Sequence, residues 1–405
     1  MIYLRGMKID VVKFDNNGRG IGYFNDKIIF IPKTVPGDVV NCEIVLEKKN
    51  YMEGKLIEII KPSKLRKEAI CPYFNTCGGC QLMHISLSEM LEYKLNKVNE
   101  LLEKNNIDYQ VKDIIKSDNI YNYRNKVTFK IINGKLGFYE HDTHKLVETH
   151  YCYLCNKVIN DLLKDISLLN IQNGELVIRC NYNNELLLSI KTDDKIENIV
   201  SLEEKHKIVG VVKNDQVIYG QDFLIDNIND LLFKISYNSF FQVNPYICAK
   251  LFNLINDYIS SNEKVMDLYC GVGTLSINSS IKSQYVLGVE IVENAIKDAN
   301  LNKLLNNKNN VDFVCDDTRN ILDKITNDFD TIILDPPRNG VSSKLIEKIL
   351  EVKTSNIIYV SCNPITLIRD LKLLVNNYNI IEFKLLDMFP NTEHVESIVY
   401  LKIKN

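Results

Sequence analysis

From residue 264 to the end of the chain, strand patterns alternate with helical patterns, and this alternation constrains the fold more than any other feature. Helical periodicity fills the intervals, as over 292–305 and 365–375. Strands separated by helices form a parallel, doubly wound sheet. The last two strands have no helix between them, which predicts a closing hairpin. The predicted strands are 264–268, 285–289, 311–314, 330–334, 356–360, 380–386 and 397–402.

The first of these strands runs into a glycine turn, Asp267-Leu-Tyr-Cys-Gly-Val-Gly273, that opens a helix. Its glycines allow the backbone to approach a ligand closely. The next strand ends in Glu290, about 20 positions later, where a carboxylate can bind two ribose hydroxyls. A glycine turn alone fits NAD or a plain tight turn equally well. The missing Gly-x-Gly-x-x-Gly spacing, together with Asp335-Pro-Pro-Arg338 after the fourth strand, favours S-adenosylmethionine.

A candidate catalytic pair lies in the last third of the chain. The fifth strand ends in Ser361-Cys-Asn-Pro364, which puts Cys362 at the carboxyl edge of the sheet, and His394-Val-Glu396 follows near the C-terminus. A thiolate that adds to C6 of uracil makes C5 nucleophilic towards a methyl sulfonium, and a base must then remove the C5 proton. Arg338 stands where enzymes that methylate exocyclic amines carry an aromatic residue. The alternative is that Cys362 is only a small buried residue ending a strand.

Five segments, taken in chain order, resemble the RNA uracil-C5 methyltransferase family. The resemblance implies an α/β class I S-adenosylmethionine methyltransferase domain with a Rossmann-like fold. It further implies that Cys362 is the nucleophile and Glu396 the base, and that Gln242, Tyr269, Glu290 and Asp335 contact S-adenosylmethionine. The segments are Phe240-Phe-Gln-Val-Asn244, Asp267-Leu-Tyr-Cys-Gly-Val-Gly273, Asp335-Pro-Pro-Arg338, Ser361-Cys-Asn-Pro364 and His394-Val-Glu396.

Short strands broken by turn signals fill residues 1–60 and predict a small β-barrel. The segments Gly20-Ile-Gly-Tyr23, Ile29-Phe-Ile-Pro32 and Val35-Pro-Gly-Asp38 resemble a TRAM domain, an OB-like RNA-binding barrel. Residues 1–67 hold 13 Lys and Arg against 8 Asp and Glu, a balance of +5, whereas the whole chain carries −3. A locally basic module can hold a phosphate backbone, although a solvated basic surface would show the same composition.

Three of the 11 cysteines lie in one short loop, spaced Cys71-x5-Cys77-x2-Cys80. Three thiolates so close together need a metal centre to offset their repulsion, and either zinc or an iron–sulfur cluster would serve. The spacing leaves Cys152 and Cys155 open as the fourth ligand. The same spacing occurs in bacterial 23S rRNA uracil-C5 methyltransferases, and that resemblance implies a [4Fe–4S] cluster with Cys152 as the fourth ligand.

We therefore expect a barrel over 1–60, an iron–sulfur cysteine loop over 61–90, a central α+β domain over 91–235 and a methyltransferase domain over 236–405. No apolar run approaches the ~20 residues of a membrane span, and no signal peptide is evident. A cytoplasmic protein with no membrane and no obligate protein partner is expected. Its expected partner is RNA, most specifically 23S rRNA, with Tyr123-Arg-Asn-Lys126 as a candidate contact.

Three other functions fit parts of the pattern. The same chemistry could act on a tRNA uridine, although relatives with that substrate typically lack both the barrel and the cysteine loop. Cytosine-C5 enzymes also use a cysteine, but in a different nucleophile loop. A non-catalytic RNA-binding iron–sulfur protein would tolerate the loss of Cys362, whereas an enzyme would lose methylation.

Overall fold

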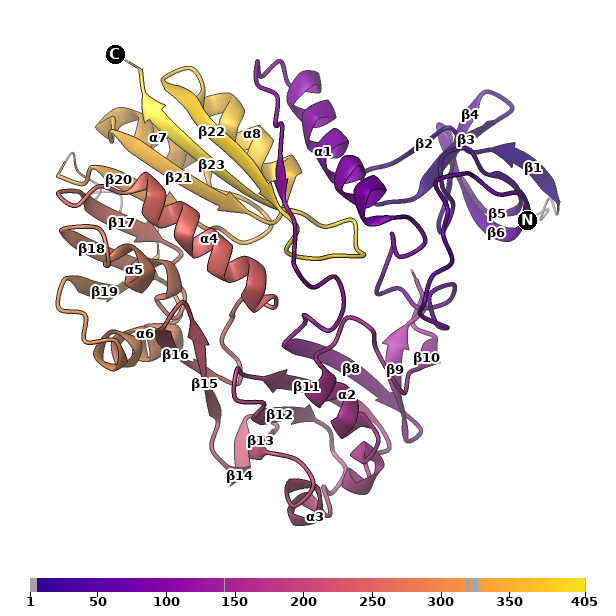
Figure 1. Cartoon of the computed structure of the whole chain (residues 1–405), viewed down its shortest axis with the longest axis horizontal. Helices are drawn as coiled ribbons and strands as arrows, with labels where there is room; N and C mark the ends of the chain where they lie inside the picture. The colour runs from indigo at the N-terminus through magenta and orange to yellow at the C-terminus, as the bar shows by residue number, and fades with distance from the viewer. Residues whose placement is uncertain (1–5, 142, 318–320, 322–325, 327, 405) are drawn as a thin grey trace. The chain divides into compact units, whose positions relative to one another are not determined.

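The computed structural model of the chain describes residues 6–141, 143–317, 321, 326 and 328–404 (Figure 1). The chain forms two compact units, each built from separate stretches of sequence. The first unit comprises Met1–Glu100, Phe138–Val147 and Phe389–His394. The second unit comprises Leu101–Gly137, Glu148–Met388 and Val395–Asn405.

A six-stranded sheet in the order β1-β5-β6-β4-β3-β2 makes up the barrel of the first unit. Apolar side chains alternate along its strands and meet in one core that includes Ile9, Ile29 and Val40. Any side chain at Gly20 on β3 would clash with its surroundings, because an added Cβ would lie 2.0 Å from the Thr34 hydroxyl oxygen. The strands are β1 (Met7–Asp10), β2 (Lys13–Phe14), β3 (Gly20–Phe24), β4 (Lys27–Ile31), β5 (Val39–Glu47) and β6 (Tyr51–Lys61).

Helix α1 (Leu87–Lys104) follows the cysteine loop. Ser86 caps it, because the Ser86 hydroxyl accepts a hydrogen bond of 3.2 Å from the Glu89 amide. The periodicity predicts a helix over 91–105, and the structure begins it one turn earlier, where the cap satisfies the first amides.

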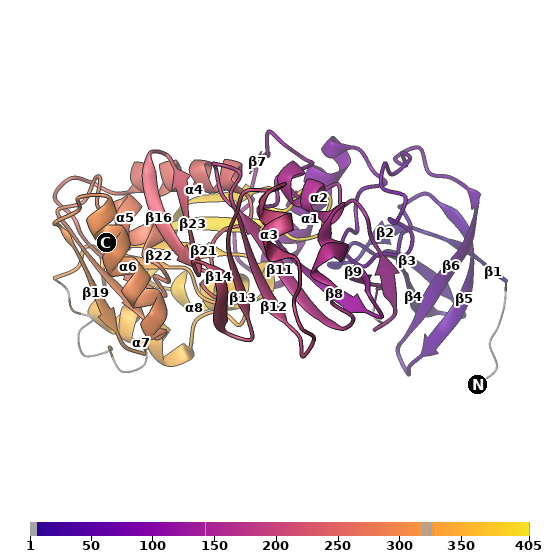
Figure 2. The same cartoon turned by 90° about the horizontal axis from the view of Figure 1, so that it is seen from below.

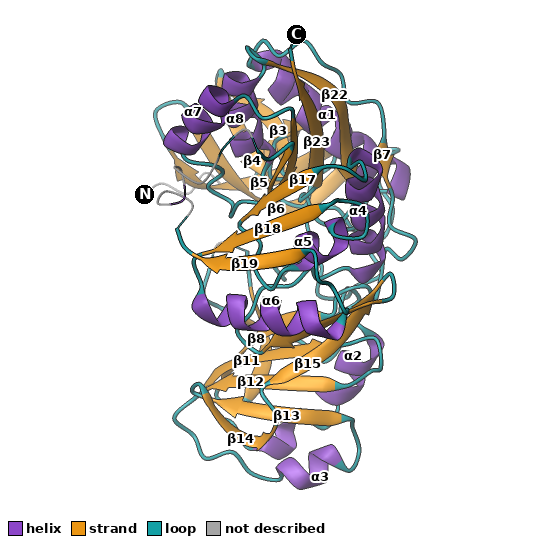
Figure 3. Cartoon of the chain, turned by 90° about the vertical axis from the view of Figure 1, so that its left-hand side faces the viewer, coloured by secondary structure: helices purple, strands orange, loops and turns teal. Residues whose placement is uncertain are grey.

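The central sheet has seven strands in the order β10-β9-β8-β11-β12-β13-β14 (Figure 3). Strand β8 pairs antiparallel with β9 and β11, as do β11 with β12 and β13 with β14, whereas β12 and β13 pair parallel. A separate hairpin of β15 (Phe223–Ile228) and β16 (Leu231–Ser236) follows. The sheet strands are β8 (Lys126–Ile132), β9 (Lys135–Tyr139), β10 (Leu146–Glu148), β11 (Gly174–Cys180), β12 (Leu186–Lys191), β13 (Ile208–Lys213) and β14 (Gln216–Gly220); the helices are α2 (Lys157–Leu163), η1 (Ile166–Leu169) and α3 (Ile199–Glu203).

The last sheet has eight strands in the order β19-β18-β17-β20-β21-β23-β22-β7. Helices α4 and α5 cover one face, and α7 and α8 cover the other (Figure 2). The elements are β7 (Ile114–Ile115), α4 (Pro245–Tyr258), β17 (Lys264–Leu268), α5 (Thr274–Ser279), β18 (Tyr285–Glu290), α6 (Glu293–Leu305), β19 (Val311–Cys315), β20 (Thr331–Leu334), α7 (Ser343–Val352), β21 (Asn356–Ser361), α8 (Pro364–Leu374), β22 (Tyr378–Leu386) and β23 (Glu396–Ile403).

This sheet confirms the predicted doubly wound topology. Strands β17 to β21 run parallel, while β23 runs antiparallel to both of its neighbours, as the missing helix predicts. Each predicted strand lies within two residues of the observed one. Strand β7 was not predicted, because its two residues are too few to carry a periodic signal.

Candidate active site

Five of the predicted site residues of the second unit lie at one edge of the eight-stranded sheet. Tyr269, Asp335 and Cys362 each directly follow a parallel strand, and Glu290 ends another. The chain order reverses between β17 and β20, and such a switch point opens a crevice at the carboxyl edge. Glu396 reaches the same edge from the opposite direction, because it begins the antiparallel strand β23.

The thiol of Cys362 lies among charged groups. Burial, and then the carboxyls of Glu396 and Asp335, raise its pKa to about 11. Arg338 acts in the other direction, through its charge and through a hydrogen bond with the thiol. Glu396 is 2% exposed, and its burial, reinforced by Asp335, holds the pKa of its carboxyl well above the ordinary value. The thiol and the carboxyl are thus close enough to influence each other.

The backbone of Arg338 is fixed by the loop that carries Cys362. The Asn363 side-chain amide donates a 2.9 Å hydrogen bond to the Arg338 carbonyl, and the Thr366 hydroxyl donates another of 3.1 Å. Asn363 also caps α8, because its side-chain oxygen accepts a hydrogen bond of 3.1 Å from the Ile365 amide. The Arg338 side chain is exposed. The Ser-Cys-Asn-Pro motif therefore supplies both a thiol and the anchor for its cationic neighbour.

Glu290 is bonded to the glycine turn. Its carboxylate accepts a 3.1 Å hydrogen bond from the Gly271 amide, and its other oxygen accepts 2.9 Å bonds from the amides of Ile291 and Val292. Tyr269 and Gly271 have positive φ angles, 70° and 55°. A Cβ added at Gly271 would meet no atom within 4 Å, so open space adjoins the turn. The turn thus offers the close backbone approach that a nucleoside ligand needs.

Two further carboxyls beneath this edge have raised pKa values. Burial raises the pKa of Asp335 to about 7. Burial also raises the pKa of Asp267 to about 7, against an opposing hydrogen bond of 2.5 Å from the Ser276 hydroxyl. Both groups therefore ionise near neutral pH, and a cationic ligand would favour their charged forms.

Gln242 lies in the loop before α4. Asn125 holds this loop by donating to the Gln242 and Val243 carbonyls at 3.3 Å and 3.0 Å. Tyr123 and Asn125 are buried, so within the predicted RNA contact Tyr123-Arg-Asn-Lys126 only Arg124 and Lys126 retain partial exposure. The supporting role of Asn125 was missed, because its partners are more than 100 positions away in the sequence.

Phe313 on β19 is a second residue that sequence reasoning missed. A Cβ at Gly273 would lie 2.6 Å from its ring, and a Cβ at Gly288 would lie 2.5 Å from it. The two glycines therefore make room for the ring beside the turn. The glycines are visible in the sequence, but the residue they accommodate is on another strand.

The cysteine loop is part of the first unit. The Lys33 ammonium donates hydrogen bonds of 3.3 Å and 2.5 Å to the carbonyls of Cys77 and Cys80. Burial lowers the pKa of Lys33, while the thiols of Cys71, Cys77 and Cys80 all act to raise it, so the three sulfurs share one cationic neighbour. Across the described parts of the chain, no three His, Cys, Asp or Glu side chains converge as metal ligands would.

Cys152 and Cys155 belong to the second unit. Cys152 is half-buried, whereas Cys155 is fully buried. The Asn160 side chain holds their turn, since its oxygen accepts the Cys152 amide at 2.8 Å and its amide donates to the Cys155 carbonyl at 3.0 Å.

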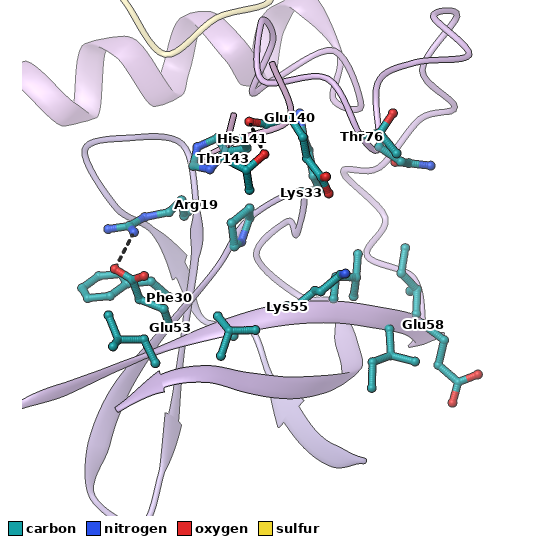
Figure 4. Close-up of a pocket in the computed structure, with 18 of the residues that line it drawn as sticks. Arg19, Phe30, Lys33, Glu53, Lys55, Glu58, Thr76, Glu140, His141 and Thr143 are labelled. Atoms are coloured by element: carbon teal, nitrogen blue, oxygen red, sulfur yellow. Dashed lines mark hydrogen bonds and ion pairs between the residues drawn. The ribbon is translucent and has the colours of Figure 1, made fainter. Parts of the chain in front are cut away.

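A cavity of about 690 Å³ lies within the first unit, between the barrel, the cysteine loop and the turn after β9 (Figure 4). The Arg19 guanidinium lies 4.5 Å above the Phe30 ring on its wall. Arg19 is also ion-paired with Glu53 at 3.6 Å. Lys55 lines the same cavity from β6. Aromatic side chains on a barrel wall can stack on bases, and cationic side chains can bind phosphates.

The sequence pattern of the tRNA (Uracil-5-)-methyltransferase family matches residues 86–404. The chain belongs to this family. The pattern of the TRAM domain matches residues 6–57 of the same methyltransferase, over the strands of the barrel. No helix in the described ranges of the enzyme is long and apolar enough to cross a membrane.

Relatives of this methyltransferase are similar over nearly their whole length. An "Uncharacterized RNA methyltransferase" of Clostridium tetani is 34% identical, over 99% of this chain and 95% of its own. Another with that description, from Caldanaerobacter subterraneus, is 33% identical over 97% and 98%. The structure of a Pyrococcus abyssi tRNA (uracil-54, C5)-methyltransferase with S-adenosyl-L-homocysteine superposes with a TM-score of 0.81, at 26% identity over 98% of this chain and 100% of that one.

The likeness to the Pyrococcus abyssi enzyme bears on whether the barrel indicates an rRNA substrate. The Pyrococcus abyssi enzyme aligns over 98% of this methyltransferase, so the alignment extends into the barrel. A barrel therefore does not separate rRNA enzymes from tRNA enzymes, and the same alignment also extends into the segment that holds the cysteine loop.

Proposed function

We propose that this RNA methyltransferase transfers a methyl group from S-adenosylmethionine to C5 of a uridine, with Cys362 as the nucleophile and Glu396 as the base. The observation that carries the proposal is the meeting of these two side chains at one sheet edge, where the Glu396 carboxyl raises the pKa of the Cys362 thiol and Asp335 and Arg338 act on both groups. A thiol and a carboxyl so placed match the two needs of uracil-C5 chemistry.

The reaction begins when the Cys362 thiolate adds to C6 of the uracil. A sulfur–carbon bond forms, and the C5=C6 electron pair moves to C5 and O4 as an enolate. S-adenosylmethionine, when bound, supplies the methyl group that C5 takes up, and its sulfonium leaves as a thioether. Glu396 then accepts the C5 proton, and the electrons of that C–H bond restore the double bond and expel the thiolate. A raised pKa gives the ionised Glu396 a higher proton affinity than an exposed carboxylate has.

Four residues would hold S-adenosylmethionine: Gln242, Tyr269, Glu290 and Asp335. The open space beside Gly271 fits a ligand that approaches the turn. Glu290 retains lone pairs for ribose hydroxyls while its amide contacts fix the carboxylate. Asp335 ionises near neutral pH and would favour a ligand that carries a sulfonium and an ammonium group.

Two features support binding of RNA beyond the target base. One is the cavity on the barrel with Phe30 and Lys55. The other is a group of cations in the second unit: the pKa of Lys126 is lowered to about 8 by burial and then by the charges of Arg179 and Arg124. A phosphate beside this group would relieve the repulsion among its members. Extrusion of the target nucleotide would bring C5 and C6 within reach of Cys362.

We further propose that Cys71, Cys77, Cys80 and Cys152 hold a [4Fe–4S] cluster. The support is chemical: Cys71, Cys77 and Cys80 all act on the Lys33 ammonium, Cys152 is more accessible than Cys155, and thiolates are the ligands of such clusters, although the described side chains do not converge as ligands in this structure. Methyl transfer needs no electron, so the cluster would serve structure or RNA positioning. Iron and sulfide analysis of protein purified without oxygen, with Cys152→Ser and Cys155→Ser in parallel, tests the assignment: only the first substitution should lower the iron content.

We propose 23S rRNA as the substrate, because the Cys71-x5-Cys77-x2-Cys80 spacing resembles that of bacterial 23S rRNA enzymes, and tRNA is the second candidate. The decisive experiment incubates the protein with S-adenosylmethionine and 5-fluorouridine-substituted RNA, because fluorine at C5 cannot leave as a proton. We expect a covalent adduct with an rRNA fragment that maps to Cys362 and carries one added methyl. The Cys362→Ala variant is the matched control and should form none.

An adduct with tRNA alone would change the substrate and keep the chemistry. If S-adenosylmethionine binds and neither RNA is trapped, the uracil-C5 mechanism proposed for this chain is wrong.

A further inference from the structure

The segment Phe389–His394, here called the entry loop, connects β22 to β23 and ends two residues before Glu396. It lies in the first unit, although the strands on either side of it lie in the second. The loop is therefore packed with the unit that contains the barrel and the cysteine loop, while the base it leads to belongs to the methyltransferase sheet.

Two lysines of α1 reach the backbone of the entry loop. Lys94 is 0% exposed, and its ammonium donates a 3.0 Å hydrogen bond to the Phe389 carbonyl. Lys97 is 9% exposed and donates one of 3.1 Å to the Glu393 carbonyl. Burial of an ammonium group is costly unless its hydrogen bonds are made, so these contacts fix both ends of the loop to the helix. Within the loop, the Phe389 carbonyl also accepts from the Thr392 hydroxyl at 2.8 Å.

The middle of the entry loop is held by the residues that directly follow Cys80. The amides of Gln81 and Leu82 donate to the Asn391 carbonyl at 3.2 Å and 3.1 Å. Asn391 is buried and has a φ of 67°, a left-handed conformation that asparagine tolerates better than most residues. The end of the cysteine loop and the entry loop are thus joined by backbone hydrogen bonds.

We propose that Lys94 and Lys97 are positioning residues for Glu396. Ser397 is paired with strands on both sides of β23, whereas Glu396, the first residue of that strand, is paired on one side only, with Leu386 of β22. The direction of Glu396 therefore also depends on the chain that enters the strand. By holding the entry loop at both ends, α1 sets the angle at which the carboxyl meets the C5 proton. This inference rests on the proposed roles of Cys362 and Glu396.

The test replaces each lysine by methionine, which has a similar length and no charge. Methionine avoids the desolvation cost of a buried ammonium group, and in Lys94→Met the Phe389 carbonyl keeps its hydrogen bond from the Thr392 hydroxyl, so this variant is expected to fold. Turnover on unmodified uridine RNA should fall about 10- to 100-fold, the usual effect of a small misplacement of a catalytic group. Addition and methylation precede proton removal, so the methylated Cys362–RNA adduct should accumulate, which denaturing electrophoresis and mass spectrometry detect.

Two controls accompany the variants. Lys104→Met changes an exposed lysine on the same helix and should leave turnover and the adduct level as in the wild type. Lys97→Arg keeps a cationic donor and should restore most of the turnover that Lys97→Met loses. The affinity for S-adenosylmethionine, measured by calorimetry, should be the same in all of these proteins.

Three outcomes would contradict the inference: unchanged turnover in both methionine variants, a fall in turnover without the adduct, or a loss of S-adenosylmethionine affinity. A wild-type protein that forms no adduct with 5-fluorouridine RNA would instead overturn the proposed function, and with it this inference.

Discussion

The thiol of Cys362 must ionise in a place that opposes ionisation. Burial and the neighbouring carboxyls of Glu396 and Asp335 disfavour a second negative charge, and Arg338 is the group that favours it. The motif Asp335-Pro-Pro-Arg338 thus contributes one residue that raises the pKa of the thiol and one that lowers it. The role of Arg338 could not be predicted from the sequence, because it depends on Asn363 and Thr366 holding its carbonyl across two loops.

The pH dependence of Cys362 alkylation follows from this balance. In the free protein, the rate of carbamidomethylation of Cys362 by iodoacetamide should keep rising with pH through the neutral range, because the pKa of the thiol is raised to about 11. Arg338→Ala removes the charge and the hydrogen bond that favour the thiolate, so the rate at any given pH should drop. Peptide mass spectrometry follows Cys362, with the exposed Cys315 as an internal reference for the reagent. A faster reaction in the variant would show that Arg338 does not stabilise the thiolate.

The raised pKa of Asp335 predicts that pH has opposite effects on the stability of the fold and on its affinity for S-adenosylmethionine. Its folded-state pKa of about 7 lies above the unfolded value of 3.8, so the stability that the neutral form provides is present below pH 3.8 and is lost as pH rises through 7. Over the same window the growing negative charge should strengthen binding of S-adenosylmethionine. Calorimetric titrations from pH 5.5 to 8.5 should show affinity rising to a plateau. Asp335→Asn should flatten that rise, and an unchanged profile would assign it to Asp267, which ionises in the same range.

Among the elements, those with strong periodicity were predicted from the sequence and those held by distant partners were not. Strands β17 to β21 have continuous apolar runs, because both faces of a doubly wound sheet are buried. The final hairpin followed from the absence of a helix, and it explains how Glu396 reaches the edge where Cys362 lies. Strand β7 and the packing of the entry loop depend on contacts with residues more than 200 positions away, which no local pattern records.

The glycines around the S-adenosylmethionine turn should differ in what their substitution disturbs. Gly271→Ala puts a methyl group into open space at a positive φ, which costs about 1–2 kcal/mol and should weaken ligand binding. Gly288→Ala places its Cβ 2.5 Å from Phe313 and 2.8 Å from the Ser276 hydroxyl, so overpacking should lower the free energy of unfolding by about 1–3 kcal/mol. Thermal unfolding of each variant, measured with and without S-adenosylmethionine, distinguishes a loss of ligand binding from a loss of stability. Equal ligand stabilisation in Gly271→Ala and the wild type would show that the ligand does not approach that turn.

At the scale of the whole molecule, charge is divided along the chain. The first 67 residues carry +5, whereas all 405 carry −3, so the remainder is −8 (−3 minus 5). Such a distribution orients an RNA towards the basic part during encounter.

Removal of one cation from the barrel cavity should change the salt dependence of RNA binding. Lys55→Ala should weaken binding and lower the slope of log affinity against log salt by about 1, the value for one lost phosphate contact. Lys195→Ala, an exposed lysine of the second unit, should leave the slope unchanged. Filter binding between 50 and 200 mM salt measures both. Equal slopes for Lys55→Ala and the wild type would place the phosphates away from this cavity.

The first unit is made of three separate stretches of chain, so its parts are synthesised at different times. The barrel and α1 emerge from the ribosome early, yet the entry loop that completes their packing is made almost last. Domains usually fold as they emerge, starting from the N-terminus. Here the Phe389 and Glu393 carbonyls that accept hydrogen bonds from Lys94 and Lys97 do not exist until most of the methyltransferase sheet has been synthesised. Assembly of the N-terminal part of the molecule is therefore tied to completion of the catalytic part, and a nascent chain released early would lack both the base and the contacts that close its first unit.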